Sequence, residues 1–336
     1  MTSQDFHQTS LIEHSNTHIP VMLGEVLEAL FPALLKNGSN LASTERRKLF
    51  VDGTLGGGGH SREIIKKLTP KDQWIGVDQD TAILKRTTQQ LEDWALNTFQ
   101  QPLNSKGHTL QANFSELKHV LQNRTDKQQS PITGGLLLDL GVSSFQLDTG
   151  ERGFSFRKEA PLDMRMSIHN KLTATEVIAS YSEADLIRIF SDYGEERMSK
   201  TLAKEIVAHR KHTSIQTTTQ LAELIKQTYD RILKRKHYRI HPATCVFQAL
   251  RIEVNQELTH LETLLDSLPQ LLAPQARAAI ISFHSLEDRI VKHRFRTLKK
   301  EYGFNILTKK PMLPTEEEIK RNPRSRSAKL RIIEAT

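Results

Sequence analysis

Four consecutive glycines, Gly56 to Gly59, follow a short apolar run that ends in Asp52. Glycine has no Cβ, so its backbone adopts positive φ and lets a ligand approach closely. A glycine-rich turn after a buried strand is where open α/β sheets bind nucleotides. Ser61, two residues beyond the last glycine, is expected to cap a helix that runs to about Leu68. This turn therefore predicts a binding site for a nucleotide-like cofactor.

Three acidic residues, Asp52, Asp78 and Asp139, each end an apolar run. Asp78 lies 26 residues after Asp52, near the position where an acid holds a ribose diol. A carboxylate directly before the glycines would repel a pyrophosphate and suits the ammonium group of S-adenosylmethionine better. A strand-end cap explains each acid singly, but three in register favour a cofactor site. The pattern therefore favours S-adenosylmethionine over NAD.

The elements that must position these residues alternate along the chain. Continuous apolar runs, typical of buried parallel strands, occupy 48–52, 74–78, 135–140 and 277–283. Helical spacing occurs at 20–35, 61–68, 81–91 and 115–121. Strands that alternate with helices predict an α/β fold with a Rossmann-like, doubly wound sheet.

Strand signals disappear between Gly150 and about His241, where three helices are expected over 182–190, 195–211 and 218–233. A long helix is expected to follow from Pro242, a residue suited to a first helical turn. We therefore predict an all-helical domain inserted into the α/β domain. The expected division is a flexible tail over 1–16, a discontinuous methyltransferase-type domain over 17–148 and 250–336, and a helical insertion over 149–249.

Composition narrows the class of protein. The chain has 336 residues, of which 37% are hydrophobic, so it can bury a core. A lone cysteine, Cys245, excludes an intrachain disulfide framework and fits a reducing, cytoplasmic location. No apolar run approaches the length of about 20 residues that spans a bilayer, so no membrane association is expected. The histidines show no metal-ligand spacing, so no catalytic metal is expected.

Basic charge is concentrated near the C-terminus. The net charge is +8 overall, yet the segment from Arg289 to Arg331 carries 14 basic and 4 acidic residues. A smaller basic cluster spans 231–239 and includes Tyr238. Clustered positive charge indicates a polyanionic partner, and we expect Arg324, Arg326, Lys329 and Arg331 to lie near RNA phosphates.

Several motifs carry a more specific resemblance, and they extend over nearly the whole chain from His18 to Arg331. They lie at 52–61, 138–148, 151–156, 161–166, 193–197, 241–244, 247–258, 281–289 and 322–327. Together they resemble the RsmH (MraW) family of bacterial 16S rRNA (cytosine-N(4))-methyltransferases. One departure is Phe145, which stands where proline is usual in that family.

The resemblance implies methyl transfer from S-adenosyl-L-methionine to the exocyclic N(4) amine of one cytidine in the decoding centre of 16S rRNA. It implies that the helical insertion recognises RNA and that the partner is 16S rRNA, within the small ribosomal subunit. The implied cofactor contacts are Gly58, Gly59, His60, Asp78, Phe114, Asp139 and Gln146. A homodimer is one option for the oligomeric state, which the sequence leaves open.

The chemistry needs little acid–base assistance, because positioning supplies much of the rate of an in-line transfer. Asp139, or the backbone carbonyls of residues 140–143, could accept a hydrogen bond from the cytosine amine. The target base must leave its stack, and Phe145, Phe154 or Phe156 could stack on it, with core packing as the alternative. His284 could line the target pocket. Ser285 and Asp288 are expected to cap a helix rather than form a hydrolase triad.

Two other functions stay open on the residues alone. One is an NAD-dependent oxidoreductase built on the same glycine turn. The other is a non-catalytic ribosome-assembly protein that binds RNA. The intact glycine turn and the acids at 78 and 139 argue against the second.

Overall fold

One mixed sheet of seven strands organises the larger part of the chain, in the order β3-β2-β1-β4-β5-β7-β6. The computed structural model describes residues 19–32, 47–122, 132–143, 145–146, 152–234 and 237–336. The strands are β1 (Leu49–Asp52), β2 (Gln73–Asp78), β3 (Gly107–Gln111), β4 (Gly135–Asp139), β5 (Arg277–Ser282), β6 (Asn305–Ile306) and β7 (Lys329–Glu334). Strands β1 to β5 are parallel, whereas β7 runs antiparallel to both of its neighbours. The α/β class and the doubly wound sheet are thus confirmed.

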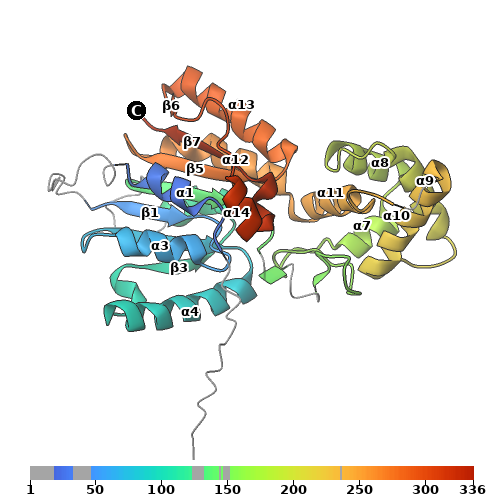
Figure 1. The fold of residues 1–336 in the computed structure, drawn as a ribbon, viewed down its shortest axis with the longest axis horizontal. Coiled ribbons are helices and arrows are strands. Elements are labelled where there is room, and N and C mark those ends of the chain that lie inside the picture. Colours follow the sequence, from blue (N-terminus) through green and yellow to red (C-terminus); the bar gives the residue numbers. More distant parts are fainter. Residues whose placement is uncertain (1–18, 33–46, 123–131, 144, 147–151, 235–236) are drawn as a thin grey trace, which may run out of the picture.

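Helices cover both faces of this sheet (Figure 1). One face packs against α1 (Leu23–Leu30), α3 (Gly59–Lys67) and α4 (Thr81–Phe99), whose apolar side chains share one core with Trp74. The opposite face packs against α5 (Leu117–Gln122), α12 (Glu257–Leu271) and α13 (Ser285–Tyr302). Burial on both faces explains why the strands are continuous apolar runs.

The strand order reverses between β1 and β4. From β1 the chain moves outward through β2 and β3, and then returns to place β4 on the other side of β1. Ligands of open α/β sheets bind in the crevice at the carboxyl ends of strands at such a switch point. Asp52 and Asp139 end the two strands that flank it.

A separate apolar core holds the helices α7 (Ala174–Ser180), α8 (Glu183–Asp192), α9 (Ser199–His209), α10 (Thr218–Leu233) and α11 (Thr244–Asn255). In Figure 1 they lie to one side of the sheet, and α11 bridges the gap. The expected single helix from Pro242 is wrong, because Gln256 breaks it into α11 and α12 with a left-handed φ of 50°. The expected boundary at 249/250 falls inside α11.

Other helix ends differ from expectation because contacts distant in sequence fix them. Ser61 does not cap α3, which begins after Gly58, and its hydroxyl donates instead to Asp52. His284, not Ser285, caps α13, and it forms a capping box with Glu287. Asp288 pairs with Arg331 rather than completing that cap.

Helix α1 covers only the middle of the range expected for it, and residues 33–46 lie outside the described part, as does the tail over 1–16. The chain ends with α14 (Glu316–Arg321) and the 3-10 helix η4 (Pro323–Ser327), which lead into β7. Within the described residues, every helix is too short or too polar to cross a membrane.

Candidate active site

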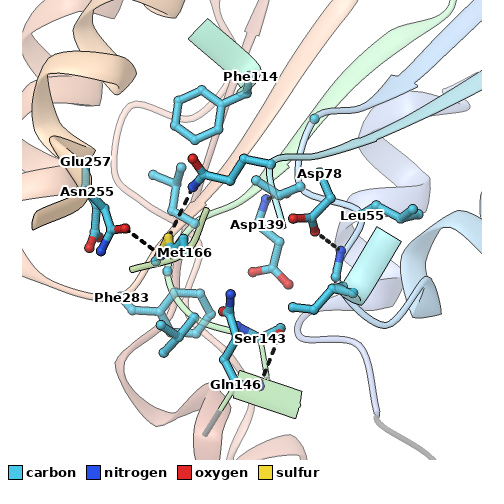
Figure 2. A pocket seen from close by; sticks show the side chains of 18 of the residues that line it. Leu55, Asp78, Phe114, Asp139, Ser143, Gln146, Met166, Asn255, Glu257 and Phe283 are labelled. Carbon is cyan, nitrogen blue, oxygen red and sulfur yellow. Dashed lines mark hydrogen bonds between the residues drawn. The ribbon is translucent and has the colours of Figure 1, made fainter. Parts of the chain in front are cut away.

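A cavity of about 310 Å³ opens at the carboxyl ends of β1, β2 and β4 and extends to the start of α12 (Figure 2). One side is lined by the glycine turn, Asp78 and Phe114. The other is lined by Met166, Arg251, Asn255, Glu257, Phe283 and Arg324. Figure 2 shows the Asp139 carboxylate pointing into the space between these two sides.

The glycine turn needs its glycines for two different reasons. Gly56 has a φ of 49°, and its N–H donates to Asp78 Oδ2 at 2.9 Å. Gly58 has a φ of 71°, and a Cβ there would lie 2.8 Å from the Thr87 methyl group. Gly56, Gly57 and Gly59 line the cavity, whereas Gly58 is buried behind it. Gly58 therefore shapes the turn, and its predicted contact with a cofactor stays a prediction.

Asp52 has a different role from the one expected. It is buried, and it accepts hydrogen bonds from the Thr54 N–H at 3.2 Å and the Ser61 hydroxyl at 2.6 Å. It does not line the cavity, so it does not reach a cofactor's ammonium group. Burial raises the pKa of Asp52 from 3.8 to about 6, against the effect of these hydrogen bonds. The carboxylate thus fastens the turn to α3.

Asp78, at the end of β2, is held by two backbone donors, Gly56 N–H to Oδ2 and Asp80 N–H to Oδ1, each at 2.9 Å. Burial raises the pKa of Asp78 to about 6, with smaller contributions from the charges of Asp80 and Asp52. The group is still ionised at neutral pH and lines the cavity. It is therefore a fixed acceptor that suits hydroxyl groups.

Asp139 is the most perturbed acid of the cavity. Burial, and then the negative charges of Asp52 and Glu287, raise its pKa from 3.8 to about 8. Its Oδ1 is buried without a hydrogen-bond donor, and its Oδ2 lies 3.6 Å from His60 Nδ1. A buried acceptor with no donor marks a place where a bound group is needed.

Gln146 is buried and does not point freely into the cavity. Its amide donates to Asp80 Oδ2 at 2.9 Å, while its Oε1 accepts the Ser143 N–H at 3.0 Å. Arg152 also donates to Asp80 Oδ2 and, at 2.7 Å, to the Met166 carbonyl. Asp80 thus ties the loop after β4 to the first residues of the helical region. The sequence analysis missed this residue, although its position two residues after Asp78 was a signal.

The side of the cavity near α12 was not predicted in detail. Arg251 donates to both carboxylate oxygens of Glu257, at 2.8 and 2.9 Å. Asn255 accepts the Met166 N–H at 2.7 Å and donates to the Met164 carbonyl at 2.8 Å. These pairs lie on either side of Gln256, so the break between α11 and α12 brings them to the cavity. They belong to the motif at 247–258, which was the available signal.

The aromatic side chains divide differently from expectation. Phe114 lines the cavity beside Phe283, which the sequence analysis did not single out. Phe156 packs in the helical core against Phe247, and Phe154 packs against the same core. Phe145 stacks under the Arg86 guanidinium at 4.5 Å, although it replaces the proline usual in the resembled family. None of these last three lines the cavity.

The basic residues near the C-terminus also separate. Arg324, on η4, is exposed and lines the cavity mouth, and Arg326 is exposed. Arg331 is buried and bound to Asp288 at 2.7 Å, so its predicted place beside RNA is wrong. Lys329 shares Asp288 at 3.5 Å. Residues 235–236 of the smaller basic cluster lie outside the described part.

Three side chains near α13 bring ligand-type atoms within 4.8 Å of one another: Glu257, His284 and Glu287. His284 does not itself line the cavity. Its Nδ1 accepts the Glu287 N–H at 3.4 Å, so a neutral ring carries its proton on Nε2, the nitrogen that faces Glu287 Oε1 at 3.2 Å. A cation there would need that nitrogen deprotonated and would compete with Arg251 for Glu257. The geometry favours an ion-pair network, and the expected lack of a catalytic metal stays a prediction.

The fold and cavity agree with the comparisons of this chain with known proteins. The sequence model of the MraW methylase family matches residues 15–336. Ribosomal RNA small subunit methyltransferase H of Leptospira borgpetersenii serovar Hardjo-bovis (strain JB197) is 48% identical over 290 residues, which cover 86% of this chain and 87% of the relative.

A second relative of the same name, from Trichormus variabilis, is 43% identical over 336 residues, which cover 99% of this chain and 97% of its own. A solved structure of an rRNA methylase from Streptococcus thermophilus aligns over 86% of this chain and 87% of its own, with 10% identity and a TM-score of 0.36. On the family match and the two curated relatives, this chain belongs to the MraW methylase family.

Proposed function

We propose that this S-adenosylmethionine-dependent methyltransferase modifies the exocyclic N(4) amine of one cytidine in the decoding centre of 16S rRNA. The observation that carries the proposal is the two-sided cavity with the Asp139 carboxylate at its centre. The glycine-turn side suits an adenosine with a short amino-acid tail. The α12 side leaves room for a nucleobase turned out of its stack.

The residues of the first side fit the cofactor. Asp78 is an ionised acceptor for the ribose hydroxyls, and Phe114, Ile83 and Ala112 offer an apolar surface for adenine. Asp139 Oδ1, which is buried without a donor, suits a positively charged neighbour. When bound, S-adenosylmethionine supplies the electrophilic methyl group. Gly59, His60 and Gln146 complete this side of the proposed site, His60 by lining the cavity and Gln146 by holding the loop after β4.

The residues of the second side fit a flipped pyrimidine. Phe283 offers a ring face, and a base can stack on an aromatic side chain. Arg251 and Glu257, locked to each other, offer donors and acceptors at fixed positions. Arg324 at the cavity mouth suits the phosphate of the same nucleotide. We assign the helical insertion to recognition of the surrounding RNA.

The exocyclic nitrogen is favoured over ring carbon C5 by the only cysteine. Carbon C5 of cytosine becomes nucleophilic only after a nucleophile such as a thiolate adds to the ring. Cys245 lies on α11 within the helical region, does not line the cavity, and has a pKa raised by burial and by Glu196. An amine needs no covalent step. Its lone pair is delocalised into the ring, and a hydrogen bond from its N–H to Asp139 helps the nitrogen become pyramidal.

The test is nucleoside mass spectrometry of 16S rRNA from cells with and without the gene. Loss of an N(4)-methylated cytidine at one position is expected, with recovery on return of the wild-type gene but not of Asp139→Asn. Fragmentation distinguishes N(4)- from C5-methylation. An unchanged modification pattern, or loss of a C5-methyl mark instead, would contradict the proposal. Purified 16S rRNA and purified small subunits, compared as substrates, identify the form that is modified.

A further inference from the structure

His60 and Asp139 face each other across the centre of the cavity in an arrangement that requires a proton. His60 Nε2 lies 2.9 Å from the Val21 carbonyl, which can only accept, so Nε2 carries a hydrogen. In a neutral ring the other nitrogen, Nδ1, then has only a lone pair. That nitrogen lies 3.6 Å from Asp139 Oδ2. An ionised Asp139 beside a neutral His60 would place two acceptors against each other, whereas one proton held by the pair makes the contact attractive.

The surroundings of the pair also favour the proton. The His60 side chain is 7% exposed and that of Asp139 19% exposed, so water screens them weakly. Asp52 from β1 and Glu287 from α13 direct negative charge at Asp139. Burial opposes ionisation of Glu287, but His284 and Arg251 hold its pKa below the usual range, so it stays charged. Asp139 Oδ1 has no donor to stabilise an anion.

We propose that His60 and Asp139 hold one proton in the cofactor-free protein and release it when the sulfonium of S-adenosylmethionine binds beside Asp139. This inference rests on the proposed placement of the cofactor. A fixed positive charge next to the carboxylate replaces the proton as its counter-charge. Asp139 then becomes an anionic acceptor only in the loaded enzyme.

The proton balance closes over one turnover. Binding releases one proton to solvent. As the bond between N4 and the methyl carbon forms and the carbon–sulfur bond breaks, Asp139 takes the proton that N4 loses. S-adenosylhomocysteine has no charge on sulfur, so the pair keeps this proton until the next sulfonium binds. The two ligands should therefore differ in proton linkage although they share every other group.

Isothermal titration calorimetry without RNA tests this difference. S-adenosylmethionine and S-adenosylhomocysteine are each titrated into the full-length protein at pH 7.5, in buffers of different ionisation enthalpy. We expect release of roughly one half to one proton per S-adenosylmethionine and of nearly none per S-adenosylhomocysteine, given the pKa of about 8 for Asp139. At pH 9.5 the release should fall towards zero. The wild-type comparison stands even where a variant fails to fold.

Two variants assign the proton to its holders. Asp139→Asn should abolish the release. The matched control Asp78→Asn should weaken both ligands without changing the proton count, because Asp78 is ionised at pH 7.5. In His60→Gln the release should move to a different pH midpoint, and an unchanged release profile from pH 6 to 9 would overturn the part assigned to His60.

Binding of S-adenosylmethionine without proton release would overturn the inference and leave the proposed function standing. Failure of S-adenosylmethionine to bind at all would overturn the inference together with the cofactor placement.

Discussion

Replacing Asp139 by asparagine should make the cofactor-free protein more stable while it removes methyl transfer. The folded-state pKa of Asp139 is raised from 3.8 to about 8. Its contribution to stability is therefore fully present below pH 3.8 and is lost as the pH rises to 8. Asparagine has nearly the same shape and does not titrate. Its amide can also donate to His60 Nδ1, which needs a donor from that side.

The magnitude follows from the span between the two values. At pH 7 the wild-type protein must protonate a group that is ionised when unfolded, which costs about 1.4 kcal/mol per pH unit above 3.8, or up to about 4 kcal/mol. Water penetration and residual structure in the unfolded chain reduce this to about 2–4 kcal/mol. For a chain of 336 residues that corresponds to a rise in melting temperature of about 3–6 °C.

Differential scanning calorimetry of both proteins at intervals from pH 5 to pH 9 measures this difference. The stability advantage of Asp139→Asn should grow with pH up to about 8 and then level off. The matched substitution Asp93→Asn, at an exposed site on α4, should leave the melting temperature nearly unchanged at every pH. A variant that is less stable than the wild type at pH 7, or an advantage independent of pH, would refute the reasoning about the buried carboxylate.

Three further outcomes are expected. Asp78→Asn should weaken S-adenosylmethionine binding about 10- to 100-fold, because a hydrogen bond to a charged group contributes about 1.5–3 kcal/mol, and unchanged affinity by calorimetry would reject the ribose assignment. Arg324→Gln should weaken RNA binding and make the salt dependence shallower by about one phosphate contact, whereas Lys71→Gln, an exposed control, should not, and equal slopes in filter-binding titrations would argue against the contact. Gly58→Ala should lower the free energy of unfolding by about 1–3 kcal/mol, because its positive φ and the nearby Thr87 methyl resist a Cβ, so an unchanged urea-denaturation midpoint would contradict the strain.

The sheet was predictable because its signals are local. Each of β1, β2, β4 and β5 is a continuous apolar run, and burial on both faces leaves little freedom in the choice of residues. Asp78 and Asp139 were predictable for the same reason, since each directly follows such a run. The resemblance to the MraW family supplied the rest of the expected site, and the family is confirmed.

The errors arose where a contact joins residues far apart in the sequence. Ser61 has the right residue type for a helix cap, but Asp52 on the neighbouring strand takes its hydroxyl. Arg331 belongs to a basic segment, but antiparallel pairing of β7 with β5 buries it against Asp288. The break at Gln256 has no glycine or proline to announce it, so periodicity alone continued the helix.

The position of the helical insertion has a consequence for synthesis of the chain. Strand β5 pairs with β4 through neighbours such as Asp139 and Ile281, which lie more than one hundred residues apart in sequence. The part of the chain that ends with β4 can form while the ribosome is still translating, but Phe283, Glu287 and Arg324 then do not yet exist to close the cavity. Pairing over such a separation is slow, because the loop must close before its contacts stabilise it. The nascent chain therefore acquires its active site only near the end of translation.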